Sequence, residues 1–194
     1  MDQAKVGQLI RDIRQEKQWT QRQLADKLNI SDKTVSKWER GMGCPDLSVL
    51  TELAAILKVD LETLLSGERN TNRPIGGNMK RLRFYVCPDC GNLLMATGDA
   101  QVHCCGHLLE PLTPQKADER EALRIEQLET EYYITADHEM TKEHYIAFVA
   151  LVTGDTLIVK KQYAEWGLEA RMPYVRHGLL MWHCTRHGLF YKTI

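Results

Sequence analysis

Apolar residues recur every three or four positions through the first third of the chain, in five short segments separated by polar or turn-forming residues. This spacing places the apolar side chains on one face of each segment and predicts five amphipathic helices. The first is expected over residues 5–17, and the fourth and fifth begin after Asp46 and Asp60, which can cap them. Gly67 is expected to end the last helix. The pattern therefore predicts a small all-α domain over residues 1–67.

The second and third helices have the clearest end signals. Thr20 and Gln23 have the spacing of a capping box at the start of a helix over residues 21–28. Ser31 is expected to cap the next helix, which Gly41 ends. Two capped helices joined by a tight corner are typical of a helix-turn-helix, whose second helix enters the DNA major groove. The expected partner is therefore double-stranded DNA.

The outward face of that second helix is polar and cationic, whereas Val35 and Trp38 are expected to face inward. Hydroxyls and cations on the outward face can reach base edges or flanking phosphates. The amino end of the preceding helix is expected to meet a phosphate. The predicted DNA-binding residues are Gln21, Arg22, Ser31, Lys33, Thr34, Ser36, Lys37 and Arg40.

Residues 5–66 resemble the lambda-repressor/Cro type of helix-turn-helix domain. The resemblance is carried by the segments TQRQLADKL and ISDKTVSKWERG, by Pro45, and by the closing segment LSVLTELAAILKVDLETLL. It implies that the first turn of the recognition helix reads bases. We expect a homodimer, which agrees with the two-fold half-sites of helix-turn-helix proteins, and binding to a short pseudo-palindromic site with a steep salt dependence.

The chain has 194 residues, enough for more than one modest domain, and a net charge of -1. Residues 1–66 hold ten basic and ten acidic residues, so attraction to phosphate depends on local placement. Residues 68–82 have the composition of a linker, and the stretch from Arg69 to Arg83 carries five cations and no acid. This basic linker either lies along the DNA backbone or is simply solvated.

Two further features of the sequence concern location and chemistry. No apolar run approaches the roughly 20 residues of a membrane helix, and the start, MDQAKVGQLIRDIRQEKQ, lacks a signal-peptide core. A cytoplasmic location is therefore expected. Five of the six cysteines follow residue 86, and all seven histidines follow residue 100. In a cytoplasmic protein this concentration indicates metal or redox chemistry rather than disulfides.

Four of the cysteines predict a small metal-binding knuckle over residues 83–112. Cys87 and Cys90 form a C-x-x-C turn, and the adjacent pair Cys104 and Cys105 follows fourteen residues later. Four thiolates from two turns can surround a tetrahedral ion, and so short a segment needs a metal to fold. Paired C-x-x-C turns would indicate a zinc ribbon, but the adjacent pair departs from that spacing. It resembles desulforedoxin, whose centre is one iron held by four cysteines, and zinc would fit the same ligands.

From Tyr132 onward the pattern becomes strand-like. YIAFVALVTGDTLIVKKQY contains two apolar runs joined by Thr-Gly-Asp, which predicts a hairpin, and RMPYVRHGLLMWHCTRHGLFYK predicts two more short strands. We therefore expect an all-β, immunoglobulin-like sandwich over residues 113–194. The predicted fold class is multidomain: a five-helix helix-turn-helix domain, a four-cysteine knuckle and a β sandwich.

Residues 83–194 resemble desulfoferrodoxin, the two-centre member of the superoxide reductase family. HEMTKEHYI is similar to the family's H-P-M-x-x-x-H-Y-I segment, with Glu139 in place of proline, and CTRHGLFYK is similar to its C-x-x-H-G segment. In that family the second iron is held by four imidazoles and an axial thiolate. The resemblance implies a second iron or zinc centre whose ligands are His138, His144, Cys184 as the axial thiolate, and His187.

The sequence departs from the family at one ligand. The family's other imidazole lies in a Glu-Lys-His segment that should fall near residues 119–126, which here are EREALRIE. No histidine lies between His107 and His138. Glu121, Glu126 or His107 are the alternatives for that position. The remaining three imidazoles and thiolate suit a tetrahedral zinc ion, or an iron with an open equatorial position.

Loss of one imidazole should alter both the redox potential and the geometry of an iron centre, so enzymatic superoxide reduction is the less favoured function and no catalytic residue is assigned. We expect a DNA-binding transcriptional regulator whose metal-binding region senses redox or iron status. The alternatives are a superoxide reductase carrying a DNA-binding domain, and a regulator whose zinc sites are only structural. His103, His177 and His183 are not expected to bind metal, and His183 should face away from the side of the strand that carries Cys184.

Overall fold

A computed structural model of the chain describes residues 2–69, 79–118 and 121–194. The chain divides into two compact units, Met1–Thr71 and Asn72–Ile194, and each is described by itself. Most of the predicted basic linker, residues 70–78, lies outside the described residues.

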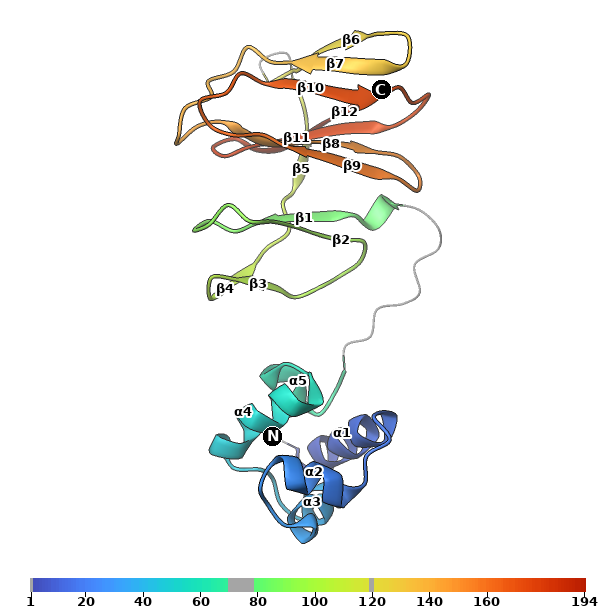
Figure 1. The fold of residues 1–194 in the computed structure, drawn as a ribbon, viewed down its shortest axis with the longest axis vertical. Helices are drawn as coiled ribbons and strands as arrows, with labels where there is room; N and C mark the ends of the chain where they lie inside the picture. Colours follow the sequence, from blue (N-terminus) through green and yellow to red (C-terminus); the bar gives the residue numbers. More distant parts are fainter. Residues whose placement is uncertain (1, 70–78, 119–120) are drawn as a thin grey trace. The chain divides into compact units, whose positions relative to one another are not determined.

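In the first unit the described residues form five α-helices, as predicted (Figure 1): α1 (Gln3–Glu16), α2 (Gln21–Lys27), α3 (Asp32–Glu39), α4 (Leu47–Leu57) and α5 (Leu61–Ser66). The predicted capping box of Thr20 and Gln23 is present at the start of α2. Helix α1 begins two residues earlier than predicted because the Asp2 carboxylate accepts hydrogen bonds from the amides of Ala4 and Lys5. None of the helices that the structure describes is long and apolar enough to cross a membrane.

The apolar faces of the five helices meet in one core. Each helix contributes a side chain with no exposed surface. These residues are Ile10, Leu24, Val35, Leu53 and Leu64. The helical spacing of apolar positions in the sequence therefore corresponds to a single buried layer.

Helices α1 and α3 cross closely at Gly7. A Cβ atom at this position would lie 2.0 Å from the carbonyl oxygen of Trp38, so a larger residue would force the two helices apart. Trp38 is buried at 6% exposure, as predicted from the face of α3 on which it lies.

A buried ion pair that the sequence analysis did not predict joins three of the helices. The guanidinium of Arg14 in α1 donates to the carboxylate of Glu39 in α3, with Nε–Oε1 at 2.6 Å and the second bond at 2.9 Å. Arg14 also donates to the carbonyl oxygen of Trp19, and the Gln21 side-chain amide donates to Glu39 at 2.8 Å. The pair therefore fixes α1, the start of α2 and the end of α3 in one arrangement.

The described part of the second unit begins with a 3-10 turn (Met79–Arg81), which two short hairpins follow. The first hairpin pairs β1 (Arg83–Val86) with β2 (Leu93–Ala96), and the second pairs β3 (Val102–Cys104) with β4 (His107–Leu109). The first hairpin is fixed to the sheet that follows, because Phe84 stacks on Phe148 with ring centroids 5.1 Å apart. The amide of Leu112 also donates to the carbonyl oxygen of Phe84 at 2.8 Å.

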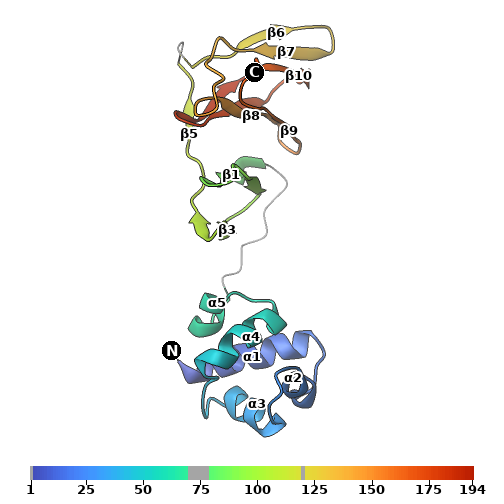
Figure 2. The same ribbon diagram turned by 60° about the vertical axis from the view of Figure 1, so that its left-hand side comes forward.

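The rest of the second unit is a two-sheet sandwich, visible in Figures 1 and 2. The three-stranded sheet has the order β10-β7-β6, and the five-stranded sheet has the order β5-β12-β11-β8-β9. The strands are β5 (Pro114–Lys116), β6 (Arg124–Gln127), β7 (Glu131–Thr135), β8 (Ile146–Val152), β9 (Leu157–Lys161), β10 (Glu169–Pro173), β11 (Leu179–Cys184) and β12 (Gly188–Thr193). Ile134, Leu180 and Trp182, all at most 1% exposed, belong to the core between the sheets.

The all-β prediction is confirmed, but the strand count was too low. The predicted hairpin is β8 and β9, whereas the last segment forms three strands, β10, β11 and β12, instead of two. Strand β10 buries only Ala170 and Met172 between charged or proline positions. Strands β5 and β6 precede Tyr132 and are mostly exposed, so they carry little apolar signal.

Candidate metal centres and nucleic-acid interface

The predicted recognition helix, α3, presents a polar face. Its cap Ser31 and the cations Lys33, Lys37 and Arg40 are exposed, while Val35 is fully buried. The two remaining predicted contacts of this helix, Thr34 and Ser36, are partly buried. The hydroxyls and cations therefore lie on one side of α3, and the buried Val35 lies on the other.

Several of these side chains are held by local hydrogen bonds. The Ser31 hydroxyl oxygen accepts the amide of Thr34 at 3.2 Å, which caps α3. Arg40 Nε donates to the carbonyl oxygen of Ser36 at 3.1 Å. Gln21 is tied to Glu39, whereas Arg22 is exposed beside it at the amino end of α2. Local hydrogen bonds thus hold Gln21, Ser31 and Arg40 in place on this surface.

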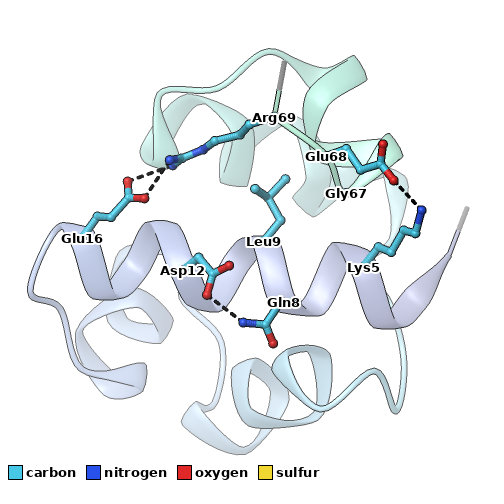
Figure 3. A pocket seen from close by; sticks show the side chains of 8 residues that line it. All are labelled: Lys5, Gln8, Leu9, Asp12, Glu16, Gly67, Glu68 and Arg69. Atoms are coloured by element: carbon cyan, nitrogen blue, oxygen red, sulfur yellow. Dashed lines mark hydrogen bonds and ion pairs between the residues drawn. The ribbon is translucent and has the colours of Figure 1, made fainter. Parts of the chain in front are cut away.

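Residues Gly67–Arg69, after α5, lie across α1 and border a groove of about 340 Å³ (Figure 3). The Arg69 guanidinium donates to both carboxylate oxygens of Glu16, at 2.7 and 2.9 Å, and lowers the pKa of Glu16. An ion pair between Lys5 and Glu68 raises the pKa of Lys5. Arg69, the first cation of the predicted basic linker, is therefore already paired within the helical unit.

The cysteine cluster consists of Cys87, Cys90, Cys104 and Cys105, whose sulfur atoms all lie within 4.8 Å of one another. The Cys90 and Cys104 sulfurs are 3.6 Å apart, and the Cys104 and Cys105 sulfurs are 4.0 Å apart. Thiolates bound tetrahedrally at zinc–sulfur distances would be separated by about 3.8 Å. The four sulfurs are therefore spaced as ligands of one ion.

Local backbone conformation explains how adjacent cysteines reach the same point. Cys105 has a φ of 49° and Gly106 a φ of 83°, so the chain turns back immediately after Cys104. The first turn closes with a hydrogen bond from the Gly91 amide to the carbonyl oxygen of Cys87 at 3.0 Å. The departure from zinc-ribbon spacing is accommodated by this left-handed turn.

The thiols of the cysteine cluster differ in acidity. A hydrogen bond from the backbone amide of Cys90 lowers the pKa of Cys87 to about 7. Hydrogen bonding with the thiol of Cys90 raises the pKa of Cys105 to about 12 and also raises that of Cys104. Binding a cation among these sulfurs would therefore release protons.

The histidine–cysteine cluster consists of His138, His144, Cys184 and His187, each with a donor atom within 4.8 Å of the others. His138 and His144 lie in the loop between β7 and β8, Cys184 ends β11, and His187 lies in the turn before β12. The structure therefore gathers four donors from three segments of the second unit.

Hydrogen bonding indicates which imidazole nitrogens are available for a metal. His138 Nδ1 contacts the carbonyl oxygen of Glu139, and His144 Nδ1 lies 2.9 Å from Glu139 Oε2. The Nε2 atoms of His138 and His144 are buried and have no hydrogen-bond partner. Buried nitrogens rarely stay unpaired, and a cation between them and the Cys184 sulfur would satisfy both. The donor set fits zinc or iron.

The three alternatives for the missing imidazole lie in different places. His107 Nε2 lies 3.0 Å from Asp89 Oδ2, beside the cysteine cluster. Glu126 is exposed on β6, paired with Tyr133. Glu121 lies at the histidine–cysteine cluster, with Oε1 at 3.0 Å from His187 Nδ1.

The histidines that were not expected to bind metal lie outside both clusters. His103 and His177 are exposed. His183 is buried, stacks on Phe148 with ring centroids 5.6 Å apart, and has its pKa lowered to about 4 by burial. It lines a cavity of about 430 Å³ that is also bordered by Cys87 and Cys90.

Comparison with known proteins distinguishes the two units. Residues 10–64 match the family described as Helix-turn-helix. The chain is 34% identical over 83 residues to the HTH-type transcriptional activator BcrR of Enterococcus faecalis, covering 40% of this chain and 39% of that protein. It is 38% identical over 61 residues to the uncharacterized HTH-type transcriptional regulator YqaE of Bacillus subtilis (strain 168), covering 31% of this chain and 53% of that protein. The chain thus spans about half or less of the length of these relatives.

A solved structure is similar to the second unit. The superoxide reductase from Treponema pallidum superposes with a TM-score of 0.50 and 21% sequence identity, covering 57% of this chain and 96% of that one. This likeness concerns the fold. The chain therefore joins an amino-terminal domain that matches the Helix-turn-helix family over residues 10–64 to a metal-donor-rich region whose fold is similar to that of superoxide reductase.

Proposed function

We propose that this protein is a sequence-specific DNA-binding transcriptional regulator whose second unit binds metal and adjusts DNA binding to redox or iron status. The observation that carries the proposal is the two-sided character of α3. Ser31 caps this helix, its cations are exposed, and Val35 on its other side is buried. A rigid helix with hydroxyls and cations on its free side is what major-groove recognition requires.

The proposed roles follow position on the helices. Gln21 and Arg22, at the amino end of α2, contact a backbone phosphate, which helix dipoles and free amides favour. Ser31, Lys33 and Thr34, in the first turn of α3, contact base edges. The remaining contacts, to flanking bases or phosphates, are assigned to Ser36, Lys37 and Arg40.

Each donor cluster is assigned one metal ion, iron or zinc. The four thiolates of Cys87, Cys90, Cys104 and Cys105 hold the first ion and cross-link the two short hairpins. His138, His144, Cys184 and His187 hold the second. Iron would supply a one-electron redox couple, whereas zinc would supply only cross-linking and charge. We further propose that the protein is a cytoplasmic homodimer, since helix-turn-helix regulators read two half-sites through a two-fold axis.

DNA binding is tested by selecting sequences from a random double-stranded pool with the full-length protein, followed by fluorescence anisotropy at several salt concentrations. We expect a short pseudo-palindrome whose affinity falls steeply with salt. Lys33→Ala should weaken binding by about 1–3 kcal/mol and relax preference at one base position. Arg11→Ala removes one cation from an exposed position of α1 and serves as the control. Equal affinity for selected and random DNA would contradict the proposal.

Sensing is tested separately with the selected DNA. The affinities of metal-loaded, oxidised and chelator-treated protein should differ, because a signal can act only through unequal affinity of the two states. Identical affinities would exclude sensing and leave plain DNA binding intact. Metal analysis of protein produced in iron-rich medium distinguishes an iron sensor from a regulator whose zinc ions are structural.

The superoxide-reductase fold favours one further candidate function, superoxide reduction at the histidine–cysteine cluster. A superoxide-consumption assay on iron-loaded protein tests this function. Rapid reduction would place enzymatic activity beside DNA binding, and absence of turnover would leave the regulator alone.

A further inference from the structure

The four sulfurs of the cysteine cluster lie close enough to one another to react together as well as to bind a metal. We infer that Cys90 and Cys104 form a disulfide when a peroxide oxidises the protein. Disulfides of cytoplasmic proteins are usually transient and redox-sensing, so such a bond suits the proposed location. The inference rests on the redox-sensing part of the proposed function and names the pair of thiols that reacts.

Cys90 and Cys104 meet where the two short hairpins approach each other. Their sulfur atoms are 3.6 Å apart, and a disulfide bond brings two sulfurs to about 2.05 Å. The Asn92 side-chain amide donates to Cys104 Sγ at 3.8 Å, which holds this sulfur beside the turn that carries Cys90. A small closing movement of the two turns therefore forms the bond, which would join the same hairpins as a shared metal ion.

Exposure shows which sulfur a peroxide in solution can reach. Cys90 and Cys105 are exposed, and Cys104 is half-buried. Cys87 is buried at 1% exposure in the small core of the knuckle. Hydrogen bonds from the backbone amides of Cys90 and Asp89 also hold the Cys87 sulfur within its own turn. Cys90 is thus open to oxidation, and Cys87 is not assigned as its partner.

The adjacent cysteines are poorly placed to join each other. Consecutive Cα atoms lie about 3.8 Å apart, whereas a relaxed disulfide needs about 4.4–6.8 Å between its Cα atoms. Cys104 ends β3 and is paired with His107 there, so the strand fixes its position. Cys105 follows in the left-handed turn, with a φ of 49°. The strand position and the 3.6 Å separation assign Cys104 as the partner of Cys90.

The reaction balances with a peroxide as the oxidant. The Cys90 thiolate attacks a peroxide oxygen, the O–O bond breaks and hydroxide leaves, which converts Cys90 to a sulfenic acid. The Cys104 thiolate then attacks the Cys90 sulfur, so that the S–S bond forms and a second hydroxide leaves. The protons given up by the two thiols convert both hydroxides to water. Two of the four thiolates are then lost as ligands, so oxidation and metal binding at the cysteine cluster exclude each other.

Peptide mapping of the zinc-loaded, full-length protein tests the pair. The protein is treated with hydrogen peroxide, the remaining thiols are alkylated, and the chain is cut with trypsin and with a protease that cleaves before aspartate. Cys87, Cys90 and the Cys104–Cys105 pair then fall into three peptides, residues 84–88, 89–98 and 99–116. Peptides 89–98 and 99–116 should become disulfide-linked within a monomeric chain. Zinc should be released from the cysteine cluster as the linkage forms.

Two matched variants separate the adjacent cysteines. Cys104→Ser and Cys105→Ser each remove one thiol of the cluster, and both are tested with zinc in excess. Cys104→Ser should lose the linkage over the same time, whereas Cys105→Ser should retain it. The reverse result would overturn the assignment. A linkage between peptides 84–88 and 89–98, or oxidation of Cys90 to a sulfinic acid without any linkage, would also overturn it.

The DNA affinity of the same oxidised sample separates this inference from the proposed function. If the Cys90–Cys104 linkage forms but the affinity for the selected DNA is unchanged, redox sensing is wrong and the disulfide stands. If the affinity changes while the linkage lies elsewhere, sensing stands and the assignment of this pair is wrong.

Discussion

The helical unit and the four-cysteine knuckle obtain their stability in different ways. Five capped helices share an apolar core in which each helix buries at least one side chain completely. The two knuckle hairpins have a small core of their own, in which Tyr85, Cys87 and Leu109 are the buried residues. The comparison teaches that the proposed DNA reader folds through its own side chains, whereas so small a core leads us to expect that the knuckle depends on a metal bound by its thiols.

Metal removal should give the largest effect. Structural zinc sites contribute about 10–16 kcal/mol of binding free energy that is also folding free energy. Chelation should therefore abolish amide-exchange protection in β3 and β4 and lower it in β1 and β2, whose Phe84 also packs on the following sheet, while α1 to α5 keep theirs. Hydrogen exchange followed by mass spectrometry measures both regions in one sample. Retained protection in the knuckle after complete metal removal would mean that its packing alone is sufficient.

The buried ion pair gives the next largest effect, confined to the helical unit. Arg14→Ala leaves the Glu39 carboxylate, whose side chain is 3% exposed, without its guanidinium partner. Removing one partner of a buried pair costs about 3–5 kcal/mol, which urea denaturation of the helical unit should record. The metal content of the protein should not change.

A double variant distinguishes the pair from simple loss of packing. Arg14→Met combined with Glu39→Leu replaces both charges by apolar groups and should recover much of the lost stability, because no buried charge remains unpaired. Arg11→Ala, on the exposed surface of α1, should stay within about 0.5 kcal/mol of wild type. A double variant as unstable as Arg14→Ala would contradict the electrostatic explanation.

Helix capping gives a smaller effect in the same unit. The Thr20 hydroxyl accepts the amide of Gln23 at 3.1 Å, and the Gln23 side chain accepts the amide of Thr20 at 2.8 Å. Thr20→Ala should lower the free energy of unfolding by about 1 kcal/mol, because an orphan amide of α2 loses its partner. Thr51→Ala removes a hydroxyl from an exposed position inside α4 and should not destabilise. Equal losses in both variants would show that the cap is not the cause.

Local sequence signals made both the helical unit and the knuckle predictable, whereas contacts between distant residues were not predictable. The helices were predictable because caps and apolar spacing are local, and the knuckle because cysteine spacing reports a donor set directly. The Arg14–Glu39 pair was not predictable, since its members are 25 positions apart and charged residues are usually exposed. The location of Glu121 required the fold for a similar reason. Three acids lie in its segment, EREALRIE, and only tertiary structure brings one of them to His187.

The smallest expected effect concerns the ion pair at the end of the helical unit. Arg69 holds the pKa of Glu16 below its ordinary value of 4.5, chiefly through its hydrogen bonds to the carboxylate. Since the folded-state pKa is lowered, this contact stabilises the folded state above pH 4.5, and its contribution is lost as the pH falls through the lowered value. The exposed pair should also weaken with salt.

Carboxyl-carbon NMR titration tests this pair directly. Arg69→Gln should raise the pKa of Glu16 toward 4.5. Lys5→Gln removes the neighbouring ion pair with Glu68 and should leave the pKa of Glu16 unchanged. Stability of wild type and Arg69→Gln should therefore differ near neutral pH and converge in acid. If the pKa of Glu16 is the same in all three proteins, Arg69 is free of α1 in solution and available as the first cation of the basic linker.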